Sequence, residues 1–67
     1  MKTHVEGLST SFRHNRLRNT WQGIVRYRHR QRIAWSETIP IERLTFQDAM
    51  HDADARMRDL LVSNLVA

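Results

Sequence analysis

The chain contains no cysteine, and only two glycines and one proline occur among its 67 residues. Without cysteine, neither disulfide bonds nor thiolate metal sites can support the small core that a chain of this length can bury. The sequence also has no apolar stretch of the length that a signal peptide or a membrane span requires. We therefore expect one small cytoplasmic domain without membrane association.

Acidic residues are missing from one long segment of the chain. None lies between Glu6 and Glu37, whereas seven arginines and two histidines fall in that segment. All the cations there are arginine, whose planar fork matches phosphate and guanine, whereas a surface that only maintains solubility usually includes lysine. This distribution and the formal net charge of +4 favour a polyanionic partner over a merely solubilising surface.

No motif typical of an enzyme or a metal site is present. The four histidines lie in different segments without His-x-x-x-His spacing, and there is no glycine-rich phosphate loop or nucleophile elbow. We therefore expect no enzymatic activity, no catalytic residue, no metal and no cofactor.

The C-terminal third shows the three- and four-residue spacing of apolar side chains that indicates an α-helix. Thr45 is a suitable N-cap, and the charge of Asp48 suits a helix N-terminus. Val62 and Val66 widen the apolar stripe near the end, which is a candidate homodimer contact together with Leu65. The stripe comprises Phe46, Ala49, Met50, Ala53, Met57, Leu60, Leu61 and Leu65. The polar face, expected to look toward water, comprises Gln47, Asp48, Asp52, Asp54, Arg58 and Asp59.

Upstream, from Thr20 to Ile39, the period changes to two, which indicates β-strands. A turn at 29–31 divides this segment into two strands, Pro40 ends the pairing, and a weaker strand over 8–13 comes first, followed by a connection at 15–19. The predicted fold is α+β, a three-stranded antiparallel β-sheet packed against one C-terminal α-helix over residues 8–67, with residues 1–7 as a flexible arm. The expected core combines Phe12, Trp21, Val25, Tyr27, Ile33 and Trp35 with Phe46, Met50, Ala53, Met57 and Leu60.

An arginine-rich face is expected on the side of the sheet away from the helix. If odd-numbered residues of the second and third strands face the helix, the even-numbered ones offer arginine forks and short polar groups to the major groove of duplex DNA. Arginines at the hairpin tips would contact phosphates. Ile24 and Ala34 would contact a thymine methyl group or be covered by a protein partner. The expected nucleic-acid-binding residues are Arg13, Arg16, Arg18, Gln22, Arg26, Arg28, Arg30, Arg32 and Ser36.

Two alternatives use the same residues differently. The basic face would serve equally well in a small inhibitor or adaptor that docks on an acidic host protein. Trp21, Tyr27 and Trp35 would support binding of RNA or another single strand if they were exposed as stacking platforms. Their phase with Val25 and Ile33 favours core packing instead.

Two segments resemble the arm-type DNA-binding domain at the N-terminus of phage and transposon integrases, whose fold is similar to the plant AP2-type domain. They are Thr20-Trp21-Gln22-Gly23-Ile24-Val25-Arg26-Tyr27-Arg28 and Thr45-Phe46-Gln47-Asp48-Ala49. The resemblance covers roughly Leu8 to Leu61 and implies a sheet that enters the major groove with the helix behind it. His29-Arg30-Gln31 replaces the family's usual turn glycine and lysine. Because an integrase continues into further domains, a chain of 67 residues starting at Met1 is expected to be an independent accessory or regulatory protein of a phage or mobile element, acting in the host cytoplasm.

Overall fold

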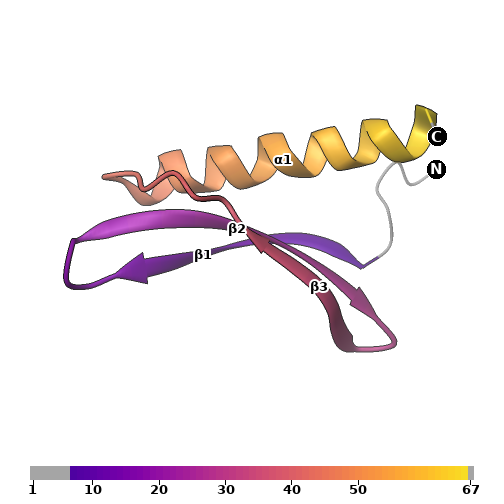
Figure 1. Ribbon diagram of the computed structural model, residues 1–67, viewed down its shortest axis with the longest axis horizontal. Coiled ribbons are helices and arrows are strands. Elements are labelled where there is room, and N and C mark those ends of the chain that lie inside the picture. The colour runs from indigo at the N-terminus through magenta and orange to yellow at the C-terminus, as the bar shows by residue number, and fades with distance from the viewer. Residues whose placement is uncertain (1–6, 67) are drawn as a thin grey trace.

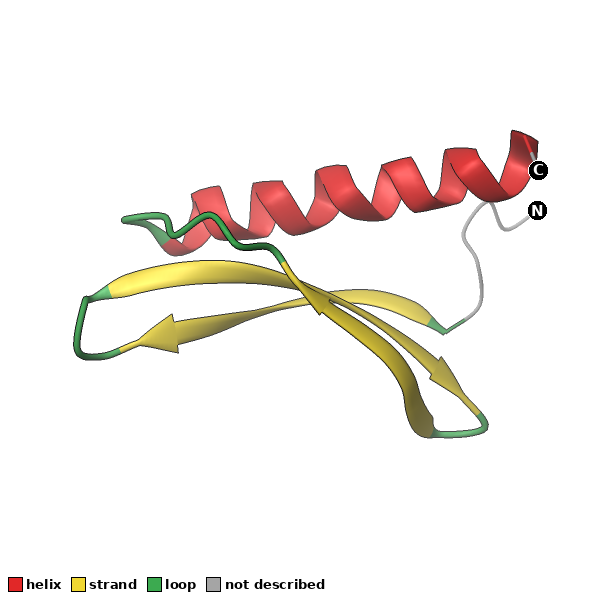
Figure 2. Ribbon diagram, in the orientation of Figure 1, coloured by secondary structure: helices red, strands yellow, loops and turns green. Residues whose placement is uncertain are grey.

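A computed structural model describes residues 7–66 of the chain. Three strands, β1 (Leu8–Asn15), β2 (Thr20–His29) and β3 (Arg32–Thr38), precede one helix, α1 (Phe46–Val66). The strands form one antiparallel sheet in the order β1-β2-β3, and the helix lies across one face of it (Figure 1 and Figure 2). The predicted α+β fold is confirmed. Within residues 7–66, no helix combines the length and apolarity that crossing a membrane requires.

The start of α1 agrees with the predicted N-cap. The backbone N–H of Asp48 donates to Thr45 Oγ1 at 3.2 Å, and the N–H of Ala49 donates to the Thr45 carbonyl oxygen at 3.3 Å. These bonds satisfy N–H groups that a helix N-terminus leaves without partners. The helix begins at Phe46 because Thr45 supplies this cap.

Helix and sheet approach each other most closely at Gly23. A Cβ at this position would collide with the Ala49 carbonyl oxygen and lie 3.0 Å from Ala53 Cβ. Both alanines and Val25 are fully buried. Because side chains alternate along a strand, this contact places the odd-numbered residues of β2 on the face toward the helix, here called the inner face. The even-numbered residues lie on the opposite, outer face.

The buried core is smaller than predicted. Phe12, Ile33, Trp35 and Phe46 were expected inside but are 42%, 54%, 39% and 40% exposed. For Trp35 the reason is that the backbone of α1 lies over β1 and β2 rather than over β3, so one helix covers only part of the inner face. Phe12 and Phe46 pack on each other, with ring centroids 4.8 Å apart, but stay partly exposed. The buried hydrophobic residues are Ile24, Val25, Ile39, Ala49 and Ala53.

A β-bulge interrupts the pairing of β2 with β3. Tyr27 lies opposite Trp35, but its neighbour Arg28 lies opposite Ile33. Ala34 is therefore the extra residue of the bulge. Such a residue shifts the phase of every side chain that follows it toward the turn.

The bulge reverses two predicted placements. Residues directly opposite each other in an antiparallel pair project to the same face. Ile33 therefore lies on the outer face with Arg28, and Arg32 lies on the inner face opposite His29. The predicted positions of Ile33 toward the helix and of Arg32 on the outer face are wrong, because strict alternation cannot anticipate an extra residue.

The β2–β3 turn consists of Arg30 and Gln31, with φ values of 53° and 67°. Two successive positive φ values characterise the type I′ turn, whose twist matches that of the flanking strands. The turn lies within the predicted 29–31 segment, although neither residue is the glycine or asparagine that this conformation favours. Figure 1 shows this hairpin bending away from α1.

The β1–β2 turn is shorter than the predicted connection at 15–19, because β1 extends through Asn15. The Asn15 side-chain oxygen accepts hydrogen bonds from the backbone N–H groups of Leu17 at 3.1 Å and Arg18 at 3.2 Å. Asn19 closes the turn with φ of 53°. Asparagine therefore acts here both as a side-chain acceptor and as a residue that tolerates the left-handed conformation.

Two other predictions concern the ends of the domain. The predicted arm lies outside the described residues except for Gly7, whose carbonyl oxygen accepts a hydrogen bond from the Arg28 N–H at 2.9 Å. Gly7 thus extends the sheet pairing. Of the proposed dimer contact, Val62 is 57% exposed, while the side chains of Leu65 and Val66 lie outside the described part.

Candidate nucleic-acid interface

The outer face carries arginine and hydroxyl side chains in cross-strand rows. Arg26 on the central strand lies opposite Ser9 of β1 and Ser36 of β3, and Arg13 lies opposite Gln22. This agrees with the predicted contributions of Arg13 and Ser36 to one face. From β1 to β3 the outer face comprises Ser9, Ser11, Arg13, Gln22, Ile24, Arg26, Arg28, Ile33, Ser36 and Thr38.

The tip of the β2–β3 hairpin carries cations on both of its faces. Arg28 lies on the outer face, whereas Arg32 lies with His29 on the inner face. Arg30 occupies the turn between the strands. The bulge therefore converts a one-sided arginine row into an arm that presents positive charge in two directions.

Among the described residues, negative charge lies on the helix side of the sheet. The six described acidic residues lie on α1, in the β3–α1 connection (residues 39–45) or, as Glu37, on the inner face of β3. Three arginines pair with them. Arg18 contacts Glu42 at 2.8 Å, while Arg43 with Asp52 and Arg56 with Glu37 form two-pronged pairs whose shorter distances are both 2.8 Å.

The remaining predicted arginines have no such partner in the described part of the chain. No described carboxylate lies within the 4.0 Å of an ion pair from any of them. Their positive charge is therefore available to an external anion. They are Arg13, Arg16, Arg26, Arg28, Arg30 and Arg32.

Two predicted contact residues have structural partners. The Gln22 side-chain amide donates to the carbonyl oxygens of Ile39 at 3.2 Å and Pro40 at 3.4 Å, which holds the β3–α1 connection against β2. Arg18 is paired with Glu42, although its side chain remains 69% exposed.

Ile24 differs from the prediction that it contacts a thymine methyl group or a protein. It lies at the centre of the outer face, between Ser11 and Thr38. Only 7% of it is exposed, which leaves too little surface for such a contact. The expectation is wrong because a central-strand residue is shielded by its neighbours even on an open face.

Asp52 was expected to face water but connects the helix to the β3–α1 connection. The hydrogen bonds from Arg43 hold the pKa of Asp52 below its ordinary value, against the opposing effect of desolvation. The hydrogen bond that Thr20 donates to Glu42 at 2.5 Å, with a smaller contribution from Arg18, likewise lowers the pKa of Glu42. The sequence contains one local indication that Asp52 and Arg56 take part in ion pairs. Their four-residue spacing places both on one side of the helix, although each pairs with a residue outside the helix.

Acid is expected to destabilise the fold partly through Asp52. Because its pKa is lowered below the ordinary 3.8 in the folded state, its contribution to stability is complete above that value and is lost as the pH falls through the folded-state pKa. Urea midpoints measured from about pH 6 to about pH 2 should therefore fall less in Asp52→Asn than in the wild type. Asp54→Asn, an exposed substitution on the same helix, should retain the wild-type dependence. Equal acid sensitivity of Asp52→Asn and the wild type would contradict this role.

Trp21 belongs to an aromatic cluster rather than to an open stacking surface. Its ring centroid lies 5.4 Å from that of Phe12 and 5.8 Å from that of Phe46, and His14 stacks on it at 4.2 Å. The predicted packing role of Trp21 is confirmed. Trp35, which is 39% exposed, has no such cluster among the aromatic contacts of the described residues.

No known protein identifies the site. Comparison with protein families, curated proteins and solved structures finds no match to this chain. Within residues 7–66, no group of three or more histidine, aspartate or glutamate side chains is arranged to hold a metal ion. The expected lack of enzymatic activity stays a prediction.

Proposed function

We propose that the protein binds duplex DNA through the arginines of the outer face and the β2–β3 hairpin. The separation of charge between the two layers is the observation that supports this proposal. Acidic residues pair with arginines behind or beside the sheet. The six remaining arginines of the sheet and its turns, five of them on the outer face or in a turn and Arg32 on the inner face at the hairpin tip, have no described carboxylate partner. Neutralising DNA phosphates with such cations releases counterions, which is the main source of affinity in this kind of complex.

The shape of the hairpin suits a DNA groove. The major groove is about 12 Å wide and admits a two-stranded β-ribbon. A ribbon with Arg28 on one face and Arg32 on the other can approach the phosphates of both DNA strands. Arg30, in the turn, would enter the groove first. Arg26, placed between two serines, has a guanidinium suited to the acceptor edge of guanine. Arg16, in the opposite turn, is suited to a phosphate.

Arg26→Ala and Arg16→Ala are expected to have different consequences. Once a preferred sequence has been selected from random duplexes, Arg26→Ala should weaken binding to it by about 1–3 kcal/mol and reduce its preference over random DNA. Arg16→Ala should weaken all duplexes alike and reduce the salt slope by about 1. Arg58→Ala, an exposed change on the helix, is the control and should bind normally. Equal losses on specific and random DNA for every sheet arginine would defeat base reading and leave only phosphate binding.

The alternative is that the same basic face docks on an acidic host protein, as an inhibitor or adaptor would. A stoichiometric complex with one acidic partner, together with no duplex binding at low salt, would favour it. A role as an accessory or regulatory protein of a phage or mobile element rests on the resemblance to integrase arm domains alone.

A further inference from the structure

The described residues leave aromatic side chains of the inner face only partly covered at the hairpin end of the sheet. Tyr27 and Trp35 lie opposite each other on neighbouring strands and project to the helix side. The backbone of the helix lies over β1 and β2, and the helix reaches β3 through the Arg56–Glu37 pair, so Trp35 remains 39% exposed. Tryptophan is usually buried more completely than this, and an exposed indole ring is a surface on which a planar group can stack.

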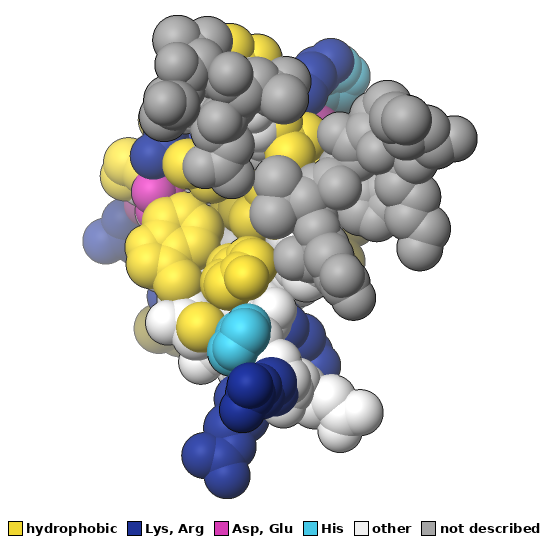
Figure 3. All heavy atoms as spheres, turned by 90° about the vertical axis from the view of Figure 1, so that its right-hand side faces the viewer, with side chains coloured by type: hydrophobic (Ala, Val, Ile, Leu, Met, Phe, Trp, Pro, Cys, Tyr) yellow, Lys and Arg dark blue, Asp and Glu magenta, His cyan; other side chains and the backbone are white. Residues whose placement is uncertain are grey.

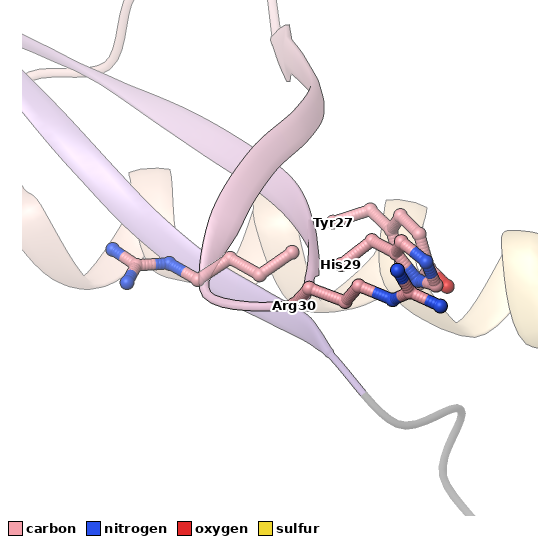
Figure 4. A pocket seen from close by; sticks show the side chains of 4 residues that line it. Tyr27, His29 and Arg30 are labelled. Carbon is pink, nitrogen blue, oxygen red and sulfur yellow. The ribbon is translucent and has the colours of Figure 1, made fainter.

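Cations border this aromatic surface. The next row toward the turn pairs His29 with Arg32, and Arg30 follows in the turn. A hollow of about 470 Å³ is lined by Tyr27, Arg28, His29 and Arg30. Figure 4 shows the side chains of Tyr27, His29 and Arg30 projecting to the same side of the hairpin. The end view in Figure 3 shows hydrophobic side chains above a histidine and basic side chains.

The single described acidic group on this part of the inner face is already neutralised. Glu37, the next inner-face residue of β3, accepts hydrogen bonds from Arg56 at 2.8 and 3.2 Å. The described residues around Tyr27 and Trp35 therefore present a net positive charge. An apolar or cationic partner would leave the arginines at the hairpin tip without a counter-charge. A ligand that is both planar and anionic would match the exposed aromatic surface and the positive charge.

We propose that this inner corner, formed by Tyr27, His29, Arg30, Arg32 and Trp35, binds a nucleotide whose base is unpaired. The base would stack on Trp35 beside Tyr27, and Arg30 and Arg32 would contact the phosphate. Stacking on aromatic side chains tolerates any base, because every base has a π-face, and it commonly changes affinity by about fivefold to a hundredfold per base.

The aromatic residues of the inner corner lie on the opposite side of the sheet from the outer-face arginines, whereas Arg30 and Arg32 at the hairpin tip are shared with the proposed duplex interface. Arg13, Arg26 and Arg28 project from the opposite side of the sheet, so a paired and an unpaired segment can be held at the same time. The preferred target is then a duplex that carries a single-stranded extension or an extruded base. This inference goes beyond duplex binding and does not require it.

The experiment titrates the ¹⁵N-labelled full chain with a short 5′-phosphorylated oligothymidylate and with the corresponding oligouridylate. The chain has two tryptophans, so their indole N–H signals distinguish the inner corner from the aromatic cluster around Trp21. The Trp35 signal, assigned with Trp35→Phe, is expected to shift and saturate while that of Trp21 stays in place. A shift with DNA, with RNA or with both supports the site and identifies the sugar it accepts.

Variants separate the two faces. Trp35→Leu and Arg32→Ser should each weaken single-strand binding, Trp35→Leu by about tenfold. The affinity of Trp35→Leu for duplex should change much less, whereas Arg32→Ser also removes a cation of the hairpin tip and should weaken duplex binding as well. Arg13→Ala should show the reverse of the Trp35→Leu pattern. Arg32 is exposed, so its variant keeps the test valid if Trp35→Leu fails to fold.

Three results would overturn the proposal. They are a Trp35 signal that moves with neither oligonucleotide, an equal shift of the Trp21 signal, and the same Trp35 shift with inorganic phosphate alone. Failure of duplex binding with a normal Trp35 response would instead refute the duplex proposal and leave the inner corner standing.

Discussion

Gly23→Val is expected to lower the free energy of unfolding by about 3 kcal/mol or more, at the upper end of what overpacking costs. A Cβ there collides with the Ala49 carbonyl oxygen and lies 3.0 Å from Ala53 Cβ. Neither group can move aside alone, since one is helix backbone and the other is fully buried. The whole helix would have to move off the sheet, in a chain whose small core leaves little stability to lose.

Urea unfolding followed by circular dichroism measures this effect. Ser36→Val, a similar change at an exposed position of the same sheet, should alter stability by only about 0.5 kcal/mol. A wild-type midpoint for Gly23→Val would show that the helix does not contact the sheet at this point.

Replacing Arg13, Arg26 and Arg28 together by glutamine is expected to weaken duplex binding by about a thousandfold near 0.05 M salt. The physical reason is that, on a mixed-sequence duplex without the site that Arg26 reads, each of the three arginines neutralises about one phosphate. Together they release about 2.7 counterions, so the salt slope should fall by about the same number. None of the three arginines has a described carboxylate partner, so their loss removes no ion pair in the described part of the chain and should leave the fold intact.

Fluorescence anisotropy at several salt concentrations measures this slope. Arg58→Gln provides a matched control, because it removes an arginine from the exposed helix surface and should retain the wild-type slope. Circular dichroism establishes that each variant is folded. An unchanged slope in the triple variant would remove the outer face from the proposed interface.

The order of elements and the helix cap could be predicted because both depend on local signals. Period-two and helical spacings are properties of neighbouring residues, and Thr45 with Asp48 forms its hydrogen bond within one turn. The same reasoning explains why residues on β1 and most of β2 were assigned to the correct faces. These features need no knowledge of distant parts of the chain.

The extent of the core and the hairpin faces could not be predicted in this way. The bulge at Ala34 is a matter of pairing between strands, and it moved Ile33 and Arg32 to unexpected faces. The exposure of Trp35 depends on where the helix crosses the sheet. The periodicity of the sequence contains no information on the position of that crossing. Alternation alone also gave no reason to expect that Ile24 is buried.

The candidate site was predicted in composition but not in its electrostatic arrangement. The acid-free arginine run is visible in the sequence, whereas the pairs of Arg43 with Asp52 and Arg56 with Glu37 join segments that only the fold brings together. In those pairs the carboxylates of Asp52 and Glu37 are bound to Arg43 and Arg56, so they do not neutralise the arginines of the outer face. The fold also shows that the side chain of Gln22 holds the β3–α1 connection, so this residue does not belong with those available to DNA.

The most direct test of the central claim is the affinity of the wild-type chain for a mixed-sequence duplex, measured by fluorescence anisotropy between about 50 and 200 mM salt. With six arginines of the sheet and its turns free of described carboxylate partners, the dissociation constant should rise by about a thousandfold over this range. Absence of binding at the lowest salt, or binding that does not depend on salt, would contradict the assignment of these arginines to duplex DNA.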